Sequence, residues 1–532
     1  MHIYRPWVDA REVAATSWTH ALRASAVLED AFVVIGLKRG LDRGDEPPVD
    51  DDRVVARVGL ADESSMTQAL AAARRDQPAW AEWPLRKRLE VGYAVNAEIA
   101  SRFDDFVDVL VTEGHPRRLA QWEVTGVVSG SGPGTLDAQA ATMETTFAAG
   151  GRDLRLVRKP DGVVCLAPPR NAAASTSVLG LLALMAGNTL VMKAPRSTPY
   201  GVTWIWRDVI EPVLRAHDVP PGVVSVLCGD PEEFLDQWLA SDHVDDIMYF
   251  GSSARGLELE RRCVEHGKKP VLELAGNDVV LVWSDAELDL AAAAAAECFY
   301  GSAQICMVPK QVVVHPDVAD DFLERLVTAV AAVRPGRPED DDVLLTPVLK
   351  AQEFFEVLDE ATGAGARLVT GGERTDENGR RDPSGVFLEP TVLRVEGLEA
   401  ARDLRAVRDE TFFPLLPVVV AEPGDDLLER CLAFLETNPY GLRNSLWGRD
   451  PAVVERFCAV RNGGLLKVND SHIGFVDGLP THGGTGFTGG VFGECNFPML
   501  RTSHLQGISV ATAVEPRRSV FDSAGPAGRS EA

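Results

Sequence analysis

The stretch that decides the fold begins Val163-Val164-Cys165-Leu166-Ala167 and ends Val271-Leu272-Glu273-Leu274. Between these two apolar runs, short apolar segments alternate with longer amphipathic ones, which predicts buried strands with covering helices. The expected strands are 163–167, 190–193, 223–227, 247–250 and 271–274, and the expected helices are 175–186, 199–217, 232–240 and 253–266. Five strands joined by four helices indicate a parallel, doubly wound α/β sheet, which binds ligands beyond the carboxyl ends of its strands.

A second α/β lobe is predicted downstream, between residues 279 and 393. Its expected strands are 279–283 and 311–315, and its expected helices are 287–299 and 318–333. Upstream, apolar residues recur at helical spacing from Met66 to Leu110, whereas the Gly/Ser-rich segment 126–135 predicts a turn or a segment boundary. Residues 1–49 lack clear periodicity, run into the loop signature 44–48 and receive no predicted role. Residues 512–532, rich in Pro, Arg, Ser and Gly, predict a mobile tail.

Composition restricts the classes of protein that this chain can be. Its 532 residues are 45% hydrophobic and 25% charged, as expected for a globular protein with a large core. The net charge of −26 disfavours binding to nucleic acid or to an anionic membrane. No secretory signal or membrane span is apparent, so a cytoplasmic location is expected. The eight cysteines form no C-x-x-C pair and have no histidine at zinc-ligand spacing, so neither a disulfide framework nor a metal site is expected.

Two short segments at the ends of predicted strands lie at the edge where ligands bind. Gly251 and Ser252 end one strand and open a helix, where free N–H groups and the helix dipole can hold a phosphate, although such turns are also ordinary connections. Lys193 and Arg196 follow another strand, and they are either ligands for a ribose and a phosphate or solvated surface charges.

Three further residues could perform chemistry. Cys306 follows an Ala-rich helix and is a candidate nucleophile, with a structural thiol as the alternative. Glu273 ends an apolar strand and is either a base whose pKa burial has raised or a residue facing solvent. Asn171 either caps the helix that follows it or donates a hydrogen bond to an oxyanion.

Taken in order, these positions resemble motifs of the aldehyde dehydrogenase superfamily over roughly residues 66–507. The matching segments are Pro169-Arg170-Asn171, Lys193-Ala194-Pro195-Arg196-Ser197-Thr198-Pro199, Tyr249-Phe250-Gly251-Ser252 through Gly256, Glu273-Leu274-Ala275-Gly276-Asn277, Ala303-Gln304-Ile305-Cys306, Glu410-Thr411-Phe412-Phe413-Pro414, Asn438-Pro439-Tyr440-Gly441-Leu442 and Val468-Asn469. Any one motif is weak, whereas eight in the family's order are specific.

The resemblance implies a role for each matching residue. Cys306 would be the nucleophile, Glu273 the general base, and Asn171 with the Cys306 N–H the oxyanion hole. The resemblance also implies the cofactor contacts: Lys193 at the adenosine ribose, Gly251 and Ser252 at the pyrophosphate, Glu410 at the nicotinamide ribose, and Phe412 near the nicotinamide ring. Arg196 replaces the family's ribose-binding glutamate, which favours NADP, with NAD as the alternative.

The resemblance also implies the domain organisation and the assembly. A dinucleotide-binding domain would comprise 50–124 and 156–272, and a catalytic domain 273–475. Segments 125–155 and 490–511 would form a small oligomerisation hairpin that makes a homodimer or homotetramer. The residues expected near a small-molecule aldehyde line an apolar tunnel or belong to the core: Trp122, Phe299, Tyr300, Ile305, Met307 and Phe475.

Five positions depart from the family's motifs: Arg170, Ala275, Asn277, Ala303 and Phe413. Ala275, Ala303 and Phe413 replace glycines, so they place a side chain where backbone approaches cofactor or substrate. A pocket of altered shape is therefore one of the alternatives. The first prediction is an NADP-preferring aldehyde dehydrogenase that releases a carboxylate. The alternatives are a CoA-acylating dehydrogenase, which Glu273 disfavours because that chemistry needs no water-activating base, and a nucleotide-binding scaffold with impaired chemistry.

Overall fold

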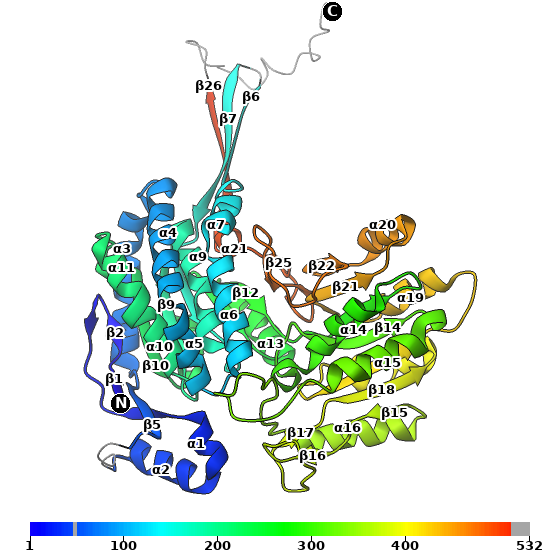
Figure 1. Ribbon diagram of the computed structural model, residues 1–532. Coiled ribbons are helices and arrows are strands. Elements are labelled where there is room, and N and C mark those ends of the chain that lie inside the picture. The colour runs from blue at the N-terminus through cyan, green and yellow to red at the C-terminus, as the bar shows by residue number, and fades with distance from the viewer. Residues whose placement is uncertain (46–50, 150, 512–532) are drawn as a thin grey trace, which may run out of the picture.

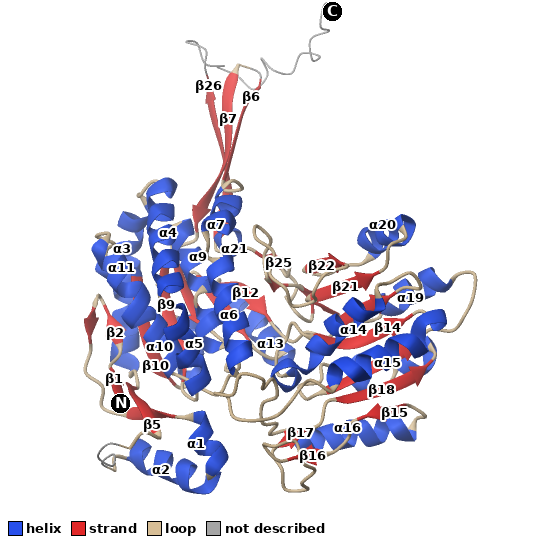
Figure 2. Cartoon of the chain, viewed as in Figure 1, coloured by secondary structure: helices blue, strands red, loops and turns tan. Residues whose placement is uncertain are grey.

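The computed structural model describes residues 1–45, 51–149 and 151–511, which form two α/β lobes side by side with a narrow arm rising from the first (Figures 1 and 2). The first lobe contains a seven-stranded sheet in the order β12-β11-β8-β9-β10-β2-β3. Its strands are β2 (Trp7–Val8), β3 (Arg11–Glu12), β8 (Val163–Ala167), β9 (Thr189–Pro195), β10 (Val224–Gly229), β11 (Asp246–Phe250) and β12 (Lys269–Glu273). The five strands from β8 to β12 run parallel, so the predicted doubly wound sheet is confirmed.

Helices cover both faces of this sheet (Figure 2). They are α3 (Glu63–Ala81), α4 (Leu85–Ser101), α5 (Phe103–Thr112), α6 (Arg117–Gly130), α7 (Pro133–Ala140), α8 (Ala173–Ser177), α9 (Leu179–Ala186), α10 (Tyr200–Trp204), the π-helical turn η1 (Ile205–Ile210), α11 (Glu211–Ala216), η2 (Pro221–Val223), α12 (Pro231–Ala240) and α13 (Ser253–Glu265).

Three helix predictions need correction. The helix expected at 175–186 breaks after Ser177, whose hydroxyl donates to the Ala174 carbonyl and competes with the helical hydrogen bonds. The helix expected at 199–217 contains the η1 π-turn, within which the Trp206 indole N–H donates to the Ser177 hydroxyl at 2.9 Å. The turn or segment boundary expected at 126–135 is confined to residues 131–132, because α6 continues to Gly130 and α7 begins at Pro133.

The second lobe contains the other seven-stranded sheet, in the order β15-β18-β19-β14-β13-β21-β22. Its strands are β13 (Asp278–Val282), β14 (Pro309–Val314), β15 (Arg367–Thr370), β18 (Thr391–Glu396), β19 (Leu415–Val420), β21 (Arg443–Trp447) and β22 (Leu465–Val468). Its helices are α14 (Leu288–Ala296), η3 (Glu297–Ala303), η4 (Pro316–Val318), α15 (Ala319–Val330), α16 (Ala351–Gly363), α17 (Leu398–Arg402), α18 (Arg405–Arg408), α19 (Leu427–Glu436) and α20 (Pro451–Val460). The second predicted α/β lobe is therefore present.

The remaining short strands are β16 (Arg374–Thr375), β17 (Phe387–Leu388), β20 (Tyr440–Gly441), β23 (His482–Gly483), β24 (Thr485–Gly486) and β25 (Cys495–Asn496). The short helix α21 (Pro498–Arg501) packs against α9 of the first lobe. The segment after β22 matters most for the site, because β23 and β24 return the chain to the end of β12. The Leu274 N–H donates to the Thr488 carbonyl there, which joins the two lobes.

The N-terminal residues, for which the sequence predicts no role, fold onto the first lobe. Strands β1 (His2–Tyr4), β4 (Trp18–Leu22) and β5 (Val54–Gly59) form a small sheet, and helices α1 (Ala24–Glu29) and α2 (Ala31–Arg43) lie between β4 and β5 in the chain. The Thr19 hydroxyl donates to the Arg196 carbonyl at 3.3 Å, so this unit supports the loop after β9. Of the expected loop 44–48, residues 46–48 lie outside the described residues, as does the expected tail 512–532.

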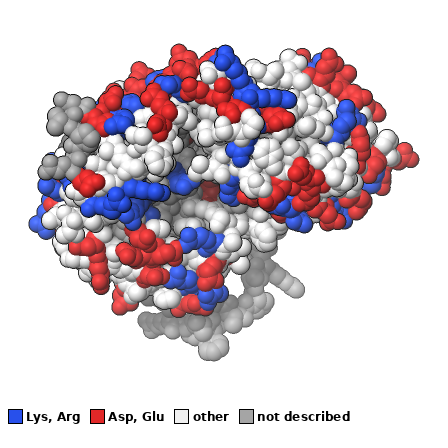
Figure 3. Space-filling model, turned by 90° about the horizontal axis from the view of Figure 1, so that it is seen from below, with Lys and Arg blue, Asp and Glu red and all other residues white. Residues whose placement is uncertain are grey.

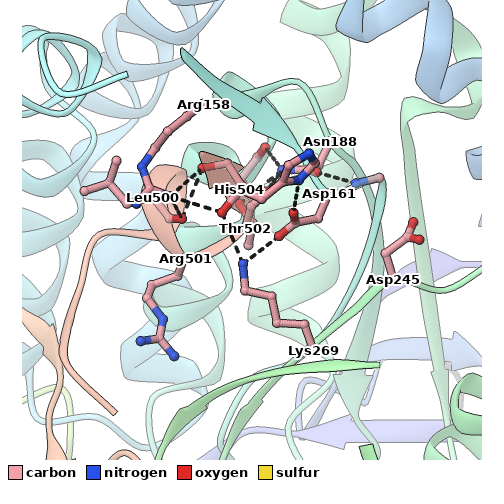
Figure 4. Close-up of polar contacts among 12 residues, drawn as sticks. Arg158, Asp161, Asn188, Asp245, Lys269, Leu500, Arg501, Thr502 and His504 are labelled. Carbon is pink, nitrogen blue, oxygen red and sulfur yellow. Dashed lines mark hydrogen bonds and ion pairs between the residues drawn. The ribbon is translucent and has the colours of Figure 1, made fainter. Parts of the chain in front are cut away.

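The arm consists of β6 (Glu144–Ala149), β7 (Arg152–Pro160) and β26 (Ser503–Ala511). Its base is anchored to the first lobe by a polar cluster (Figure 4). Asp161 accepts from Lys269 and pairs with His504, both at 2.7 Å, and the Asn188 amide donates to the Thr502 carbonyl at 2.9 Å. The arm therefore leaves the lobe at a defined position. Within the described ranges, no helix combines the length and apolarity that crossing a membrane requires.

Candidate active site

A cavity of about 380 Å³ lies where the two lobes meet. Figure 3 shows a hollow between the lobes, with lysine and arginine side chains at its rim. Seven residues singled out from the sequence contribute to the cavity wall: Asn171, Gly251, Ser252, Glu273, Cys306, Glu410 and Phe412. Lys193 and Arg196 are not among the described residues that line it. The fold thus brings together side chains that are more than 200 residues apart in the sequence.

Cys306 lies in the connection between η3 and β14, on a loop with an unusual backbone. Gly301, Ser302 and Ala303 all have φ between 55° and 60°, a left-handed conformation that costs energy at the two residues other than glycine. The loop is held by the Ser302 hydroxyl, which donates to the Thr346 carbonyl at 2.7 Å, and by Lys310, whose ammonium donates to the Ala303 carbonyl at 2.6 Å. These bonds present the Cys306 thiol to the cavity.

The Cys306 Sγ atom lies 3.8 Å from Oε1 of Glu273, at the end of β12. The other oxygen of Glu273 accepts a 2.6 Å hydrogen bond from the Gly483 N–H. Burial raises the pKa of Glu273 to about 7, with the Gly483 N–H opposing the shift. A carboxylate with this pKa can accept a proton at neutral pH.

The thiol is protonated before any reaction begins. Burial and the adjacent Glu273 carboxylate raise the pKa of Cys306 well above its ordinary value. A protonated thiol is a weak nucleophile, so it needs a nearby base. The arrangement places that base within contact distance.

The Asn171 amide faces the same loop from the first lobe. Its nitrogen donates to the Gln304 carbonyl at 2.9 Å. An amide carries two N–H donors, so one remains for a ligand in the cavity.

The wall near α13 suits an anionic ligand. Ser252 is the N-cap of this thirteen-residue helix, and its side chain makes no capping hydrogen bond. The first backbone N–H groups of a helix lack partners within the helix, and the helix dipole favours negative charge there. This end of the cavity can therefore hold a phosphate group.

Two more polar groups have unused bonding capacity. The Lys193 ammonium is buried at the end of β9 with no hydrogen-bond partner among the described residues, and burial lowers its pKa. Glu410 accepts from the Gly276 N–H at 2.9 Å through Oε1, so Oε2 stays available for a ligand. Together with the α13 terminus, these groups fit the phosphates and ribose hydroxyls of a dinucleotide. Arg196, three residues after Lys193 in the chain, is exposed and has no ion-pair partner in the described part of the chain.

The departures from the family's motifs lie differently in the structure. Phe413 is buried against Phe354, with ring centroids 5.6 Å apart, and its side chain belongs to the core of the second lobe. Asn277 is buried and donates to the Val407 carbonyl at 2.8 Å. Ala303 is fully buried. Of the five departures, only Ala275 and Arg170 line the cavity. The expectation that Phe413 and Ala303 place side chains against a ligand is wrong.

The apolar wall matches the sequence prediction in part. Trp122, Ile305, Met307 and Phe475 line the cavity, whereas Phe299 is core and Tyr300 is absent from the described lining. Trp122 and Phe475 stack with ring centroids 5.1 Å apart. These two rings come from α6 and from the segment after β22.

Three residues near the site were not recognised in the sequence. His482 lines the cavity, and burial lowers its pKa to about 3, so its ring is neutral. Lys310 and Arg443 lie behind the cavity as buried cations. No local sequence pattern marks Lys310 or Arg443.

Comparison with known proteins identifies the family. The model described as "Aldehyde dehydrogenase family" matches residues 45–494. The chain belongs to the aldehyde dehydrogenase family. The resemblance and the fold class expected from the motifs are thereby confirmed, as is the reaction class, oxidation of an aldehyde with NAD or NADP.

Individual relatives of the family are distant. A benzaldehyde dehydrogenase [NAD(+)] of Pseudomonas putida is 28% identical over 451 residues, covering 83% of this chain and 88% of that protein. A putative succinate-semialdehyde dehydrogenase [NADP(+)] of Mycobacterium ulcerans is 27% identical over 469 residues, covering 86% and 85%. The crystal structure of an NAD-dependent aldehyde dehydrogenase from Sinorhizobium meliloti superposes with a TM-score of 0.80 at 22% identity, covering 97% and 96%. That structure shares the aldehyde dehydrogenase fold.

Proposed function

We propose that this aldehyde dehydrogenase oxidises an aldehyde to a carboxylate through Cys306 and Glu273, with NADP preferred over NAD. The contact between Cys306 and Glu273 at 3.8 Å carries the proposal, because it pairs a nucleophile with a carboxyl group whose pKa burial has raised to about 7. Both side chains face a cavity whose wall also offers the Asn171 amide.

In the first half-reaction, Glu273 takes the proton of the Cys306 thiol, and the thiolate attacks the aldehyde carbon. The Asn171 amide and the Cys306 N–H stabilise the oxyanion that forms. The bound dinucleotide supplies the acceptor for the hydride that leaves this carbon, so a thioester remains on Cys306. Glu273 releases its proton to solvent, deprotonates a water that attacks the thioester, and the carboxylate departs as the Cys306 thiolate is restored.

The proposed cofactor contacts follow the available groups. Lys193 binds the adenosine ribose, Gly251 and Ser252 hold the pyrophosphate, and Glu410 binds the nicotinamide ribose. Phe412 packs near the nicotinamide ring. Arg196 binds the 2′-phosphate of NADP, since its exposed guanidinium has no competing carboxylate among the described residues.

For the substrate, we favour an apolar, aromatic aldehyde. The stacked rings of Trp122 and Phe475 form a flat apolar wall, and aromatic ligands pack well on such a surface. The benzaldehyde activity named for the Pseudomonas putida relative agrees with this class.

The domain division stays as expected from the family: 50–124 with 156–272 for the cofactor, 273–475 for catalysis, and 125–155 with 490–511 for assembly. The exposed faces of β6 and β26 support an arm that pairs with another copy in a homodimer or homotetramer. We place the enzyme in the cytoplasm.

Activity tests this proposal directly. With benzaldehyde and NADP, Cys306→Ala and Glu273→Gln should each lower kcat by at least about 10³-fold. Cys458→Ala is the matched control, because Cys458 is exposed and does not line the cavity. Full turnover in Cys306→Ala would refute the assignment.

Cofactor preference can be measured without a substrate. A ligand at about 100 times its Kd stabilises the folded state by roughly 2.7 kcal/mol, which raises Tm visibly. NADP should raise Tm more than NAD, and Arg196→Glu should reverse that order. A larger rise with CoA would support the acylating alternative, and no rise with any nucleotide would support the scaffold.

A further inference from the structure

Arg443, the first residue of β21, bridges two distant points of one segment. Its side chain is buried, with 1% exposure. One terminal nitrogen donates to the His472 carbonyl at 3.1 Å, and the other donates to the Thr481 carbonyl at 2.8 Å. The guanidinium therefore ties together the two ends of residues 472–481.

This segment and the residues after it contribute to the active site. Phe475, Thr481 and His482 line the cavity. The next residue, Gly483, donates its N–H to Glu273 at 2.6 Å. A shift of the segment would consequently move both the aromatic wall and the hydrogen bond to the base.

The Arg443 charge also faces the reacting pair. Burial lowers the pKa of Arg443, and neighbouring acidic groups oppose that shift. In return, the guanidinium lowers the pKa of Glu273, which burial raises. The titratable groups around it are Asp278 on β13, Glu273 on β12, Cys306 on its loop, Glu297 on η3, Lys467 on β22, His482 on β23 and Cys495 on β25.

We propose that Arg443 is a positioning residue for the reaction, acting on Glu273 and Cys306 by clamping residues 472–481 and by its buried charge. This inference rests on the proposed roles of Cys306 and Glu273. It assigns a function to a buried cation that touches neither the cavity nor the reacting atoms. The two donor bonds explain why arginine suits this position, since a planar fork reaches two carbonyls at once.

The first experiment measures the alkylation of Cys306 by iodoacetamide against pH in the cofactor-free enzyme. Arg443→Met should slow alkylation at pH 7 on the order of tenfold and move its midpoint up by about one pH unit. Arg461→Met is the matched control, because Arg461 is also buried in the second lobe but pairs with Glu436. An unchanged midpoint in folded Arg443→Met would overturn the charge role.

The second experiment separates the clamp from the charge. Arg443→Lys keeps the charge but lacks the fork, so hydrogen exchange in a peptide spanning 472–483 should rise while the alkylation midpoint stays near that of the wild type. Exchange equal to that of Arg461→Lys would overturn the clamp. This variant also provides the test if Arg443→Met does not fold.

Failure of the proposed reaction gives a different result. If Glu273→Gln leaves the alkylation profile unchanged, Glu273 is not the base for Cys306, and the proposed function fails. Faster exchange in Arg443→Lys would then still support the clamp.

Discussion

The Lys310 ammonium lies 2.6 Å from the Ala303 carbonyl and 3.0 Å from the Thr411 carbonyl. One buried cation thus joins the loop that leads to Cys306 with the loop that carries Glu410 and Phe412. Both loops line the cavity, so their separation depends on a residue that is not part of its wall.

Lys310→Met should therefore destabilise the protein and disturb the site. Two buried carbonyls would lose their donor, which should lower the free energy of unfolding by about 2 kcal/mol. Denaturant unfolding and the alkylation rate of Cys306 measure the two effects. Lys268→Met is the control, because Lys268 binds the Ser241 and Val244 carbonyls in the first lobe. A similar change in Cys306 reactivity in both variants would contradict this prediction.

Ala303→Gly should stabilise the protein. Ala303 has φ of 58°, where its Cβ is strained and glycine is not. The free energy gained by relieving this strain exceeds the cost of the extra conformational entropy that glycine gives the unfolded chain. The free energy of unfolding should therefore rise by about 0.5–1 kcal/mol. Thermal unfolding tests this, with Ala303→Val as the opposite case. A lower Tm for the glycine variant would show that the alanine methyl group contributes more by packing.

The raised pKa of Glu273 predicts a pH dependence of activity. In the proposed reaction Glu273 accepts a proton only when it is ionised, so kcat/KM should rise with pH through about 7. Glu273→Gln should abolish this limb along with most of the activity. A pH profile in the wild type that is flat between 6 and 8 would contradict the role.

The same shift predicts a pH dependence of stability. Between pH 4.5 and about 7, the folded protein keeps a proton on Glu273 that the unfolded chain has lost. Its contribution to stability is therefore full below pH 4.5 and falls by about 3 kcal/mol as pH rises through this window. The Tm of Glu273→Gln minus the Tm of the wild type should therefore be larger at pH 8 than at pH 5. An equal difference at both pH values would argue against the shift.

Gly126 on α6 should determine the shape of the aromatic wall. A Cβ at Gly126 would overlap the Phe475 ring, so Gly126→Ala must displace that ring. The KM for benzaldehyde should rise more than the KM for acetaldehyde. Gly134→Ala on the neighbouring helix α7 is the control, because a Cβ there meets nothing within 4 Å and Gly134 does not line the cavity. Equal KM changes for the two aldehydes would place the substrate elsewhere.

The five parallel strands of the first lobe, β8 to β12, could be predicted well because they are largely buried on both faces, whereas β2 and β3 of the same sheet were not predicted. The run 163–167 coincides with β8, and the other strands differ from prediction by one or two residues at their ends. The helices were less predictable, since the break after Ser177 depends on local hydroxyl bonding and the π-turn on a distant partner for Trp206. Tertiary contacts override local preference at such places.

Residues recognisable from motifs were found because they carry reactive groups at typical positions: Asn171, Glu273, Cys306 and Glu410. Arg443 and Lys310 were missed for a physical reason. Their partners are backbone carbonyls, which any residue supplies, and most of these lie roughly 30 to 100 positions away in the chain. No periodicity or motif records such a pairing.

By itself, the sequence determined the α/β class, the family and the identity of the nucleophile and base candidates, because burial patterns and reactive side chains can be recognised in short stretches of the chain. Only the tertiary structure decided that Phe413 belongs to the core, that Lys193 is buried without a partner, and that Glu273 has a pKa near 7. Burial, distance and electrostatic environment arise when segments far apart in the chain come together, and these quantities convert a carboxyl group into a base.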